Sequence, residues 1–307
     1  MKSKEAKAFA PASIGNVAVG FDMLGHSLSG YGDTATVRRT TDGRVRITAI
    51  RGLVTELPKD AKSNTAGRAL LGLAKLRPGV GFEVELDKGI PLGSGMGGSA
   101  ASAVAALVAA NAVLDEPVSM ETLYDLAMDG EAAASGSRHG DNVAPMLLGG
   151  LVIAPANGAP VKVPVPKDLY CTLVHPHFVL ETRKARAALK GAYELHDFVV
   201  QSEGLALLLA GCWTKSFELI RRGFRDVLVE PRRERLIPGF KRVKKAALDG
   251  GALGSSISGG GPSVFAWFDS KAKATKAGAA MKEAFKTEKL DADVLISKVD
   301  GPAAKVI

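Results

Sequence analysis

The stretch with the clearest chemical potential is residues 91–102, which read PLGSGMGGSAAS. Glycine permits close approach and unusual backbone dihedrals, so such a loop can gather several backbone N–H groups around one point. A helix expected to start near Ser99 would add its free N–H groups and the positive end of its dipole. The stretch therefore predicts an anion site that could neutralise much of a triphosphate.

The loop lacks the Gly-Lys-Ser/Thr ending of a Walker A motif, so its positive charge must come from elsewhere. Mg²⁺ is a candidate source, because it takes oxygen ligands and would find the hydroxyls of Ser99 and Ser102 and the carboxylate of Glu131 within reach. The alternative is that small residues here only let two elements pack tightly. A dinucleotide-binding βαβ unit is disfavoured, because several strand-like segments precede the loop.

The elements that must position this loop follow from hydrophobic spacing. Residues 81–93 (GFEVELDKGIPLG) read as a strand that enters the loop and 99–114 as the helix that leaves it. Alternation over 35–50 predicts a β-hairpin with a turn at Asp42-Gly43. Two further helices are expected at 64–76, with Asn64 or Thr65 as its cap, and at 120–135.

The second half of the chain alternates strands and helices. Residues 146–155 predict a buried strand or hairpin, and the Pro-rich segment that follows is the best boundary, which gives domains 1–160 and 161–307. Beyond it we expect strands at 170–176, 262–268 and 293–299, and helices at 183–195, 202–222, 242–251 and 271–286. This order predicts an α+β fold whose second domain is a ferredoxin-like sandwich.

Composition limits the class of protein. The chain has 307 residues, 46% of them hydrophobic, and a net charge of +8, which fits either a polyanionic ligand or a merely solvated basic surface. The two cysteines form no metal-like spacing, and neither a signal-peptide core nor a membrane-length apolar run is seen. A cytoplasmic protein without disulfides is expected.

Three motifs in order resemble those of the galactokinase, homoserine kinase, mevalonate kinase and phosphomevalonate kinase (GHMP) superfamily. They are APASIGNVAVGFDMLG at 10–25, the loop at 91–102 and SISGGGPSVFAWF at 256–268. The resemblance implies an ATP-dependent small-molecule kinase with an N-terminal domain like ribosomal S5 domain 2 and a ferredoxin-like C-terminal domain. It also implies a homodimer, and neither a nucleic-acid nor a membrane partner is expected.

Four segments outside the shared phosphate motifs resemble the homoserine kinases in particular. These are GFDMLG after Asn16, SRHGDNVAP at 137–145, TRKAR at 182–186 and EPRRERLIPGF at 230–240. This resemblance implies that L-homoserine is the acceptor, that its side-chain hydroxyl is phosphorylated to O-phospho-L-homoserine, and that the reaction serves threonine biosynthesis.

The resemblance also assigns roles around the acceptor. Arg186 and Arg233 would clamp the substrate carboxylate, because a guanidinium makes bidentate bonds that lysine cannot reproduce. Asp22 would pair with the ammonium, and His139 and Thr182 would be further contacts. Without the resemblance, each would more often be an ordinary surface or structural residue.

The residues expected to act in catalysis beside the substrate hydroxyl carry side-chain amides. Several related kinases place an aspartate near the position of Asn142, and an amide cannot accept the proton. We therefore expect Asn16 and Asn142 to orient the hydroxyl, with the proton passing to the γ-phosphate or leaving late, because phosphoryl transfer depends mainly on positioning and electrostatics. Asp141 is the neighbouring carboxylate, but on an extended segment its side chain would point away from that of Asn142. An aspartate base remains an open alternative.

The ATP site follows from the same resemblance. Ser99 and Glu131 are the expected Mg²⁺ ligands, and Asn64 and Thr65 are expected near the adenosine. The residues expected to contact the phosphates are Pro91, Leu92, Gly93, Ser94, Gly95, Met96, Gly97, Gly98, Ser99, Ala100, Ala101 and Ser102.

Two other functions are alternatives for this sequence. Another kinase of the superfamily, such as a mevalonate kinase, would take an acceptor without an ammonium, which leaves Asp22 unexplained. An RNA-binding protein with an S5-like domain would use the basic residues of 221–247, but acidic residues interrupt that stretch and few aromatics accompany it.

Overall fold

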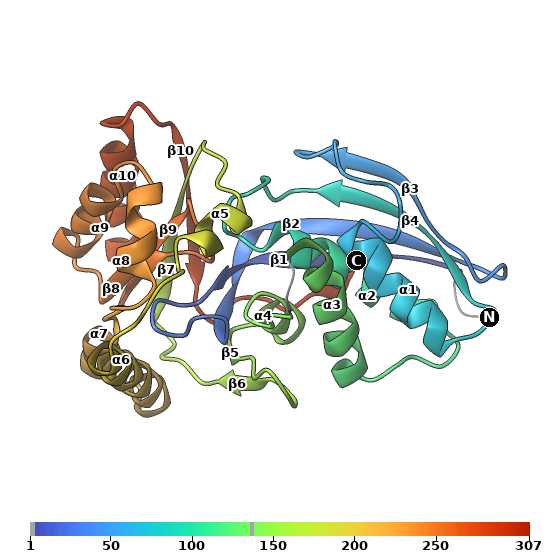
Figure 1. Cartoon of the computed structure of the whole chain (residues 1–307), viewed down its shortest axis with the longest axis horizontal. Coiled ribbons are helices and arrows are strands. Elements are labelled where there is room, and N and C mark those ends of the chain that lie inside the picture. Colours follow the sequence, from blue (N-terminus) through green and yellow to red (C-terminus); the bar gives the residue numbers. More distant parts are fainter. Residues whose placement is uncertain (1–3, 136–137) are drawn as a thin grey trace.

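The computed structural model describes residues 4–135 and 138–307 and contains two β-sheets with helices packed on them (Figure 1). The first sheet has the strand order β11-β1-β2-β4-β3, with β5 on β2 and β6 on β5. Its strands are β1 Glu5–Gly15, β2 Leu24–Thr40, β3 Val45–Gly52, β4 Gly81–Lys88, β5 Leu151–Ile153, β6 Val161–Val163 and β11 Lys305–Val306. Its helices are α1 Thr65–Leu76, α2 Gly98–Ala112, α3 Met120–Ser135 and α4 Val143–Leu148.

Helix α2 is the centre of this half. It packs against β1 and β2 on one side and against α1 and α3 on the other, and most of its residues are buried. Its alanines permit this close packing on several sides, because they present little bulk in any direction. The strand–loop–helix order predicted for 81–114 is confirmed, and the N-terminus of α2 therefore points out of the core towards the loop.

The predicted hairpin over 35–50 is wrong in its pairing. The turn forms, with the Asp42 carboxylate accepting hydrogen bonds from Thr40 Oγ1 and the Arg44 N–H. The two strands then diverge, and β4 lies between them, antiparallel to β2 and parallel to β3. Alternating apolar residues fit either arrangement, so the local pattern does not distinguish a direct hairpin from one opened by a third strand.

The second sheet has the order β10-β7-β9-β8, and every neighbouring pair is antiparallel. Its strands are β7 Tyr170–Pro176, β8 Gly254–Ile257, β9 Val264–Phe268 and β10 Ala292–Lys298. Helices α9 Phe240–Asp249 and α10 Lys271–Lys286 pack on it (Figure 1). The α+β class and the ferredoxin-like arrangement are confirmed.

The intervening helices differ from expectation. They are α5 Thr182–Ala187, α6 Leu195–Thr214, α7 Phe217–Gly223 and α8 Glu230–Arg233, followed by the 3₁₀ turn η1 Glu234–Leu236. The single helix expected over 202–222 is divided at Lys215, which adopts a left-handed conformation with φ of 60°. Residues 146–148, expected in a strand, belong to α4 instead, because a buried apolar run fits either element.

The two halves of the chain share a core. One hydrophobic cluster contains residues from both sheets, including Leu28 of β2 and Trp267 of β9. Trp267 Nε1 also donates to His26 Nε2 at 3.2 Å, across the junction. The domain boundary at residue 160 stays a prediction. Two strands that follow it in the sequence belong to the first sheet, since β6 pairs with β5 and β11 pairs with β1. Within the described ranges no helix is long and apolar enough to cross a membrane.

Candidate active site

A cleft of about 500 Å³ opens where loops of the two halves meet. Its lining comes from the segment after β1, the loop before α2, the turn before α4, α5, α8 and the glycine segment after β8. The predicted site residues that line it are Asn16, Asp22, Asn64, Thr65, Pro91, Leu92, Gly93, Ser94, Gly95, Gly97, Gly98, Ser99, Ser102, Glu131, His139, Asn142, Thr182, Arg186 and Arg233. Met96, Ala100 and Ala101 are buried in the core beneath it instead.

The loop needs glycine at two points. Gly97, immediately before α2, has φ of 71°, and a Cβ there would lie 2.8 Å from both Asn142 Oδ1 and Ser13 Oγ. Gly95 has φ of 76°, and a Cβ there would lie 2.4 Å from the Ser258 carbonyl oxygen. A side chain at either position would therefore strain the backbone and push the loop away from its neighbours.

The second glycine segment holds the loop from the other half of the chain. Ser258 Oγ donates to the Gly95 carbonyl at 2.7 Å, and Ser263 Oγ donates to the Ser94 carbonyl at 2.6 Å. The Gly259 N–H donates to the Gly15 carbonyl at 3.1 Å. These bonds join the three glycine-containing motifs of the sequence at one place.

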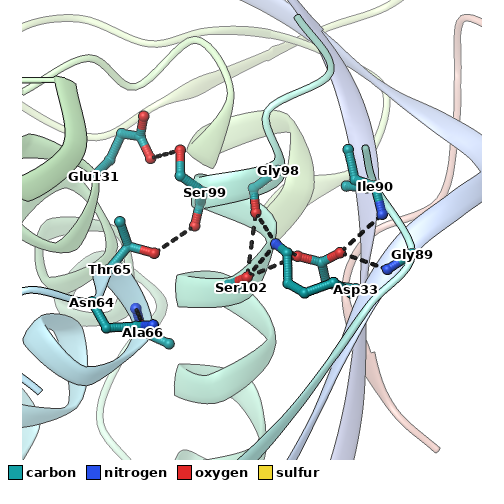
Figure 2. A network of polar contacts seen from close by, with 11 residues as sticks. Asp33, Asn64, Thr65, Ala66, Gly89, Ile90, Gly98, Ser99, Ser102 and Glu131 are labelled. Carbon is teal, nitrogen blue, oxygen red and sulfur yellow. Dashed lines mark hydrogen bonds and ion pairs between the residues drawn. The ribbon is translucent and has the colours of Figure 1, made fainter. Parts of the chain in front are cut away.

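An oxygen pair stands at the start of α2. Ser99 Oγ donates to Glu131 Oε2 at 2.6 Å, and Thr65 Oγ1 donates to the Ser99 carbonyl at 3.0 Å (Figure 2). Burial raises the pKa of Glu131 to about 7, although the bond from Ser99 acts in the opposite direction. A hydroxyl and a carboxylate facing the phosphate loop are oxygen ligands of the kind that Mg²⁺ prefers.

This pair is small for a metal site made by protein alone. The described residues contain no group of three or more His, Cys, Asp or Glu side chains placed to hold a metal ion. Mg²⁺, however, usually binds to one or two protein ligands together with phosphate oxygens and water. The donor set therefore fits a metal that arrives with a phosphate substrate.

Asn64 has a structural task that limits its polar contacts with a ligand. Its Oδ1 accepts from the Ala66 and Gly67 N–H groups and caps α1, while its Nδ2 donates to the Pro58 carbonyl at 2.9 Å. The predicted cap is thus confirmed. These contacts use both lone pairs of Oδ1 and one hydrogen of Nδ2, so one Nδ2 hydrogen is left to meet a ligand.

A buried lysine beneath the loop was missed by the sequence reasoning. Lys88 ends β4, is 4% exposed, and forms an ion pair with Asp33 of β2. Its Nζ also donates to the Gly98 carbonyl at 2.7 Å and to Ser102 Oγ at 2.6 Å. The lysine thereby connects the strand before the loop to the first turn of the helix after it.

Asp33 completes this connection (Figure 2). Its Oδ1 accepts from the Gly89 and Ile90 N–H groups at 3.0 and 3.2 Å, and its Oδ2 accepts from Ser102 Oγ at 2.8 Å. The Ser102 hydroxyl, predicted to face phosphate, is thus engaged beneath the loop. The only local sign of this network in the sequence is a lysine just before the glycine loop. Its partner Asp33 lies 55 residues earlier.

The acceptor side of the cleft contains a charged pair. Arg186 donates two hydrogen bonds to the Asp22 carboxylate, at 2.8 and 3.1 Å, and His139 Nδ1 lies 3.3 Å from the same group. Asp22 adopts a left-handed backbone with φ of 59°, and its N–H donates to Asn16 Oδ1 at 3.0 Å. Within the part of the chain that the structure describes, the buried Nε of Arg186 has no hydrogen-bond partner. The structure thus places a carboxylate and a guanidinium side by side.

Arg233 is more deeply buried than Arg186. Its Nε donates to the Ala185 carbonyl at 3.2 Å and its Nη1 to the Gly259 carbonyl at 3.0 Å. Both guanidinium groups lie near the Phe21 ring, at 5.7 Å for Arg186 and 5.3 Å for Arg233. The aromatic ring therefore holds two like charges close together, partly through cation–π attraction.

The two predicted amides lie at the centre of the cleft. Asn16 Nδ2 donates to the Gly259 carbonyl at 2.8 Å, and Asn142 Oδ1 accepts from Ser13 Oγ at 2.8 Å. The expectation that Asp141 and Asn142 point in opposite directions is wrong, because a Cβ on Gly15 would meet both side chains. Residues 141–142 form a turn, so the alternation of an extended segment does not apply.

Asp141 is the buried carboxyl of this centre. Its Oδ2 accepts from the Asn16 N–H at 3.1 Å. Burial raises the pKa of Asp141 to about 6, and the nearby Asp22 adds to the shift, while the bond from Asn16 opposes it. Ser137, the first residue of the segment that contains His139, lies outside the described residues.

The fold and the cleft define a two-domain kinase of the GHMP type, and comparison with protein families agrees. Residues 64–150 match the GHMP kinases N terminal domain, and residues 205–287 match the GHMP kinases C terminal domain. L. major mevalonate kinase in complex with R-mevalonate shares the fold alone, with a TM-score of 0.66 and 15% identity over 98% of this chain and 100% of that one.

More similar relatives narrow the family. Homoserine kinase of Xanthomonas campestris is 57% identical over 99% of this chain and 94% of its own length, and that of Chlorobium phaeobacteroides is 44% identical over 99% and 100%. The crystal structure of homoserine kinase from Cytophaga hutchinsonii has a TM-score of 0.94 and 44% identity, covering 99% of this chain and 98% of that one. The chain belongs to the homoserine kinase family of the GHMP kinases.

Proposed function

We propose that this chain transfers the γ-phosphoryl group of ATP to the side-chain hydroxyl of L-homoserine and forms O-phospho-L-homoserine, a step of threonine biosynthesis. The observation that carries this proposal is the Asp22–Arg186 pair, which lines the same cleft as the phosphate loop. An α-amino acid presents an ammonium and a carboxylate on one carbon, and the pair presents their counterparts side by side.

The loop and the N-terminus of α2 would bind the ATP phosphates through backbone N–H groups. The Lys88–Asp33 ion pair adds no net charge, so its contribution would be to fix both ends of the loop rather than to neutralise phosphate. The cleft wall formed by Val54, Leu57 and Pro58, together with Asn64 and Thr65, would enclose the adenosine.

Ser99 Oγ and Glu131 Oε2 would hold Mg²⁺ beside the phosphates. When bound, the metal supplies positive charge that offsets the charge on the transferring group. Glu131, with a pKa of about 7, would have to be ionised to serve as a ligand, so metal binding is expected to release a proton near neutral pH.

On the acceptor side, the substrate would replace the contact within the Asp22–Arg186 pair. Its ammonium would face Asp22 and His139, and its carboxylate would face Arg186 and Arg233, whose fork geometry suits a carboxylate. Thr182, at the start of α5, lines the same side and would add a hydroxyl contact.

Transfer would be in line. The bond between the substrate oxygen and Pγ forms as the bond from Pγ to the ADP oxygen breaks, and the hydroxyl proton passes to an oxygen of the transferred phosphoryl group. Asn16 and Asn142 would orient the hydroxyl, and Asp141 would hold Asn16 in place through its N–H. Such transfer relies on positioning and electrostatic stabilisation more than on a strong base.

The test is to incubate the full chain with Mg-ATP and L-homoserine, follow ADP release, and identify the product by phosphorus NMR. Formation of a phosphate monoester of homoserine supports the proposal. Phosphorylation of mevalonate or galactose but not homoserine would overturn the acceptor assignment. A homodimer in the cytoplasm is also expected.

A further inference from the structure

Helix α5 and the segment that follows it have little burial to hold them in place. The helix is six residues long and buries Ala185, while residues 190–194 after it are exposed. A helix this short is not stable alone, so its position depends on contacts with the rest of the molecule. The same helix brings Thr182 and Arg186 to the acceptor side of the cleft. Its position therefore bears directly on how an acceptor is bound.

Arg232 of α8 binds the carbonyl oxygens of the segment after α5. Its Nη1 donates to the carbonyls of Leu189 at 3.3 Å and Lys190 at 3.0 Å. Its Nη2 donates to the carbonyl of Ala192. Carbonyls where a helix ends lack partners within the helix, and an arginine side chain can satisfy them. One guanidinium thereby holds three points of the chain just beyond α5.

The Tyr193 side chain covers this guanidinium. The centre of its ring lies 3.8 Å from Arg232 Cζ, and its hydroxyl donates to the Leu189 carbonyl at 2.7 Å. An arginine stacked on an aromatic face keeps its N–H groups available in the plane of the guanidinium. The backbone also passes close by, because a Cβ on Gly191 would lie 3.3 Å from Arg232 Nη1. The stack therefore fixes the plane in which Arg232 donates.

Helix α8 gives this contact a well-anchored base. The Asp226 carboxylate accepts hydrogen bonds from the N–H groups of residues 228–230, at 2.9 to 3.1 Å, and caps the helix. The next residue along α8, Arg233, donates from Nε to the Ala185 carbonyl at 3.2 Å. Successive arginines of α8 thus hold α5 on its cleft side and beyond its far end.

We infer that Arg232 is a positioning residue for the acceptor, because it fixes α5 on α8 and thereby sets where Arg186 meets Asp22 and the substrate. The inference rests on the proposed function, in which Arg186 binds the carboxylate of L-homoserine. Within the described part of the chain, the lining of the cleft includes Arg233 but not Arg232, so Arg232 would act through the backbone of α5. A small misplacement of a group that binds the reacting substrate can cost a large factor in rate.

The phosphate side of the cleft depends on other contacts. Ser258, Ser263 and Lys88 hold the phosphate loop, and none of these three belongs to α5 or α8. Loss of the Arg232 contacts should therefore weaken acceptor binding and leave ATP binding nearly unchanged.

Steady-state kinetics of Arg232→Met test this difference. KM for L-homoserine is expected to rise about tenfold while KM for ATP changes less than about twofold, because the lost hydrogen bonds hold α5 alone. Arg232→Lys keeps the charge without the fork and should give an intermediate value. Arg235→Met, at an exposed arginine of η1, is the matched control. An equal rise in both KM values, or an unchanged value for L-homoserine, overturns the inference.

A double variant shows whether Arg232 acts through Arg186. If it does, adding Arg232→Met to Arg186→Lys should raise KM for L-homoserine less than about threefold, because the fork that Arg232 positions is already gone. A general effect on folding would appear equally in both backgrounds. A rise as large as the one in the unaltered background would mean that the two residues act independently, which contradicts the inference.

Limited proteolysis tests the contact without relying on the acceptor. Trypsin can cleave after Lys190 when the segment leaves its place, so Arg232→Met should be cut there several-fold faster than the unaltered chain and Arg235→Met. Mass spectrometry identifies the site. If the unaltered chain does not phosphorylate L-homoserine, the proposed function fails, and the rate of cleavage still shows whether Arg232 holds the segment. Equal cleavage of all three proteins would show that it does not.

Discussion

At the scale of single residues, the cleft groups that would meet the two substrates already have partners within the protein. Asp22 forms an ion pair with Arg186, and Ser99 Oγ donates a hydrogen bond to Glu131. Each pair satisfies buried or half-buried polar groups before a ligand arrives, which avoids leaving a charge unpaired. Under the proposed function, each substrate would replace one partner of these pairs, and this exchange can be tested one residue at a time.

Arg186→Lys keeps the charge but removes the fork that makes two bonds to a carboxylate. We expect KM for L-homoserine to rise about 10- to 100-fold, as for the loss of a hydrogen bond to a charged group, with KM for ATP little changed. Steady-state kinetics with each substrate varied in turn measure both values. Arg222→Lys, at an exposed arginine of α7, is the control; equal effects of both variants would contradict the assignment.

Glu131→Gln should reveal the raised pKa of Glu131 through stability. The folded chain keeps Glu131 protonated up to about pH 7, whereas an unfolded glutamate ionises near 4.5. Between these values the folded state binds more protons, so this group makes stability fall as pH rises. Without metal or nucleotide, the variant should therefore gain in Tm over the unaltered chain between pH 5 and pH 8.

Thermal unfolding at several pH values measures that difference, and Glu121→Gln in the first turn of α3, where the carboxylate is exposed, is the control. A difference in Tm that does not change with pH would mean that Glu131 is not buried as a neutral acid. The same variant should lose most activity with Mg-ATP, because an amide is a poor Mg²⁺ ligand.

At the scale of elements, the Lys88–Asp33 network sets the position of the loop. It connects the end of β4, the middle of β2 and the first turn of α2, so the loop is fixed at both ends. Removing one charge of a buried pair leaves the other uncompensated and typically costs about 3–5 kcal/mol. Stability and positioning can be separated by removing both charges.

Lys88→Met should lower both Tm and activity. The double variant Lys88→Met/Asp33→Asn should recover much of the Tm, because no buried charge remains. It should still show kcat/KM for ATP reduced about tenfold or more, since the contact of Nζ with the Gly98 carbonyl is lost. Calorimetry and kinetics on the three proteins measure this. Full recovery of activity in the double variant would show that the network only stabilises the fold.

Elements also show what sequence could and could not predict. The strand, glycine loop and helix were predictable, because their signals are local: alternation, glycine clustering and an Asn64 cap. The insertion of β4 between β2 and β3 was not, since this pairing joins residues far apart in the sequence, such as Val45 with Phe82. Lys88 was missed for the same reason, because its meaning depends on Asp33.

At the scale of the whole molecule, both halves contribute residues to the cleft, and the proposed acceptor side combines Asp22 of the first half with Arg186 of the second. The first sheet and α2 provide the phosphate loop, while α5 and α8 bring Arg186 and Arg233 from the second half. Three motifs in sequence order indicated that these parts belong to one site. How these parts face one another across the cleft depends on the packing of the two halves. A single motif carries no information about that packing.

The central claim is that the Asp22–Arg186 pair selects an α-amino acid acceptor. The direct measurement is kcat/KM, by ADP release, for L-homoserine, for 4-hydroxybutanoate, which lacks the ammonium, and for 3-aminopropan-1-ol, which lacks the carboxylate. We predict that each analogue loses about 100-fold or more, because it leaves one half-buried charged partner unpaired. Comparable kcat/KM for all three alcohols would contradict the account, since the pair would then play no part in choosing the acceptor.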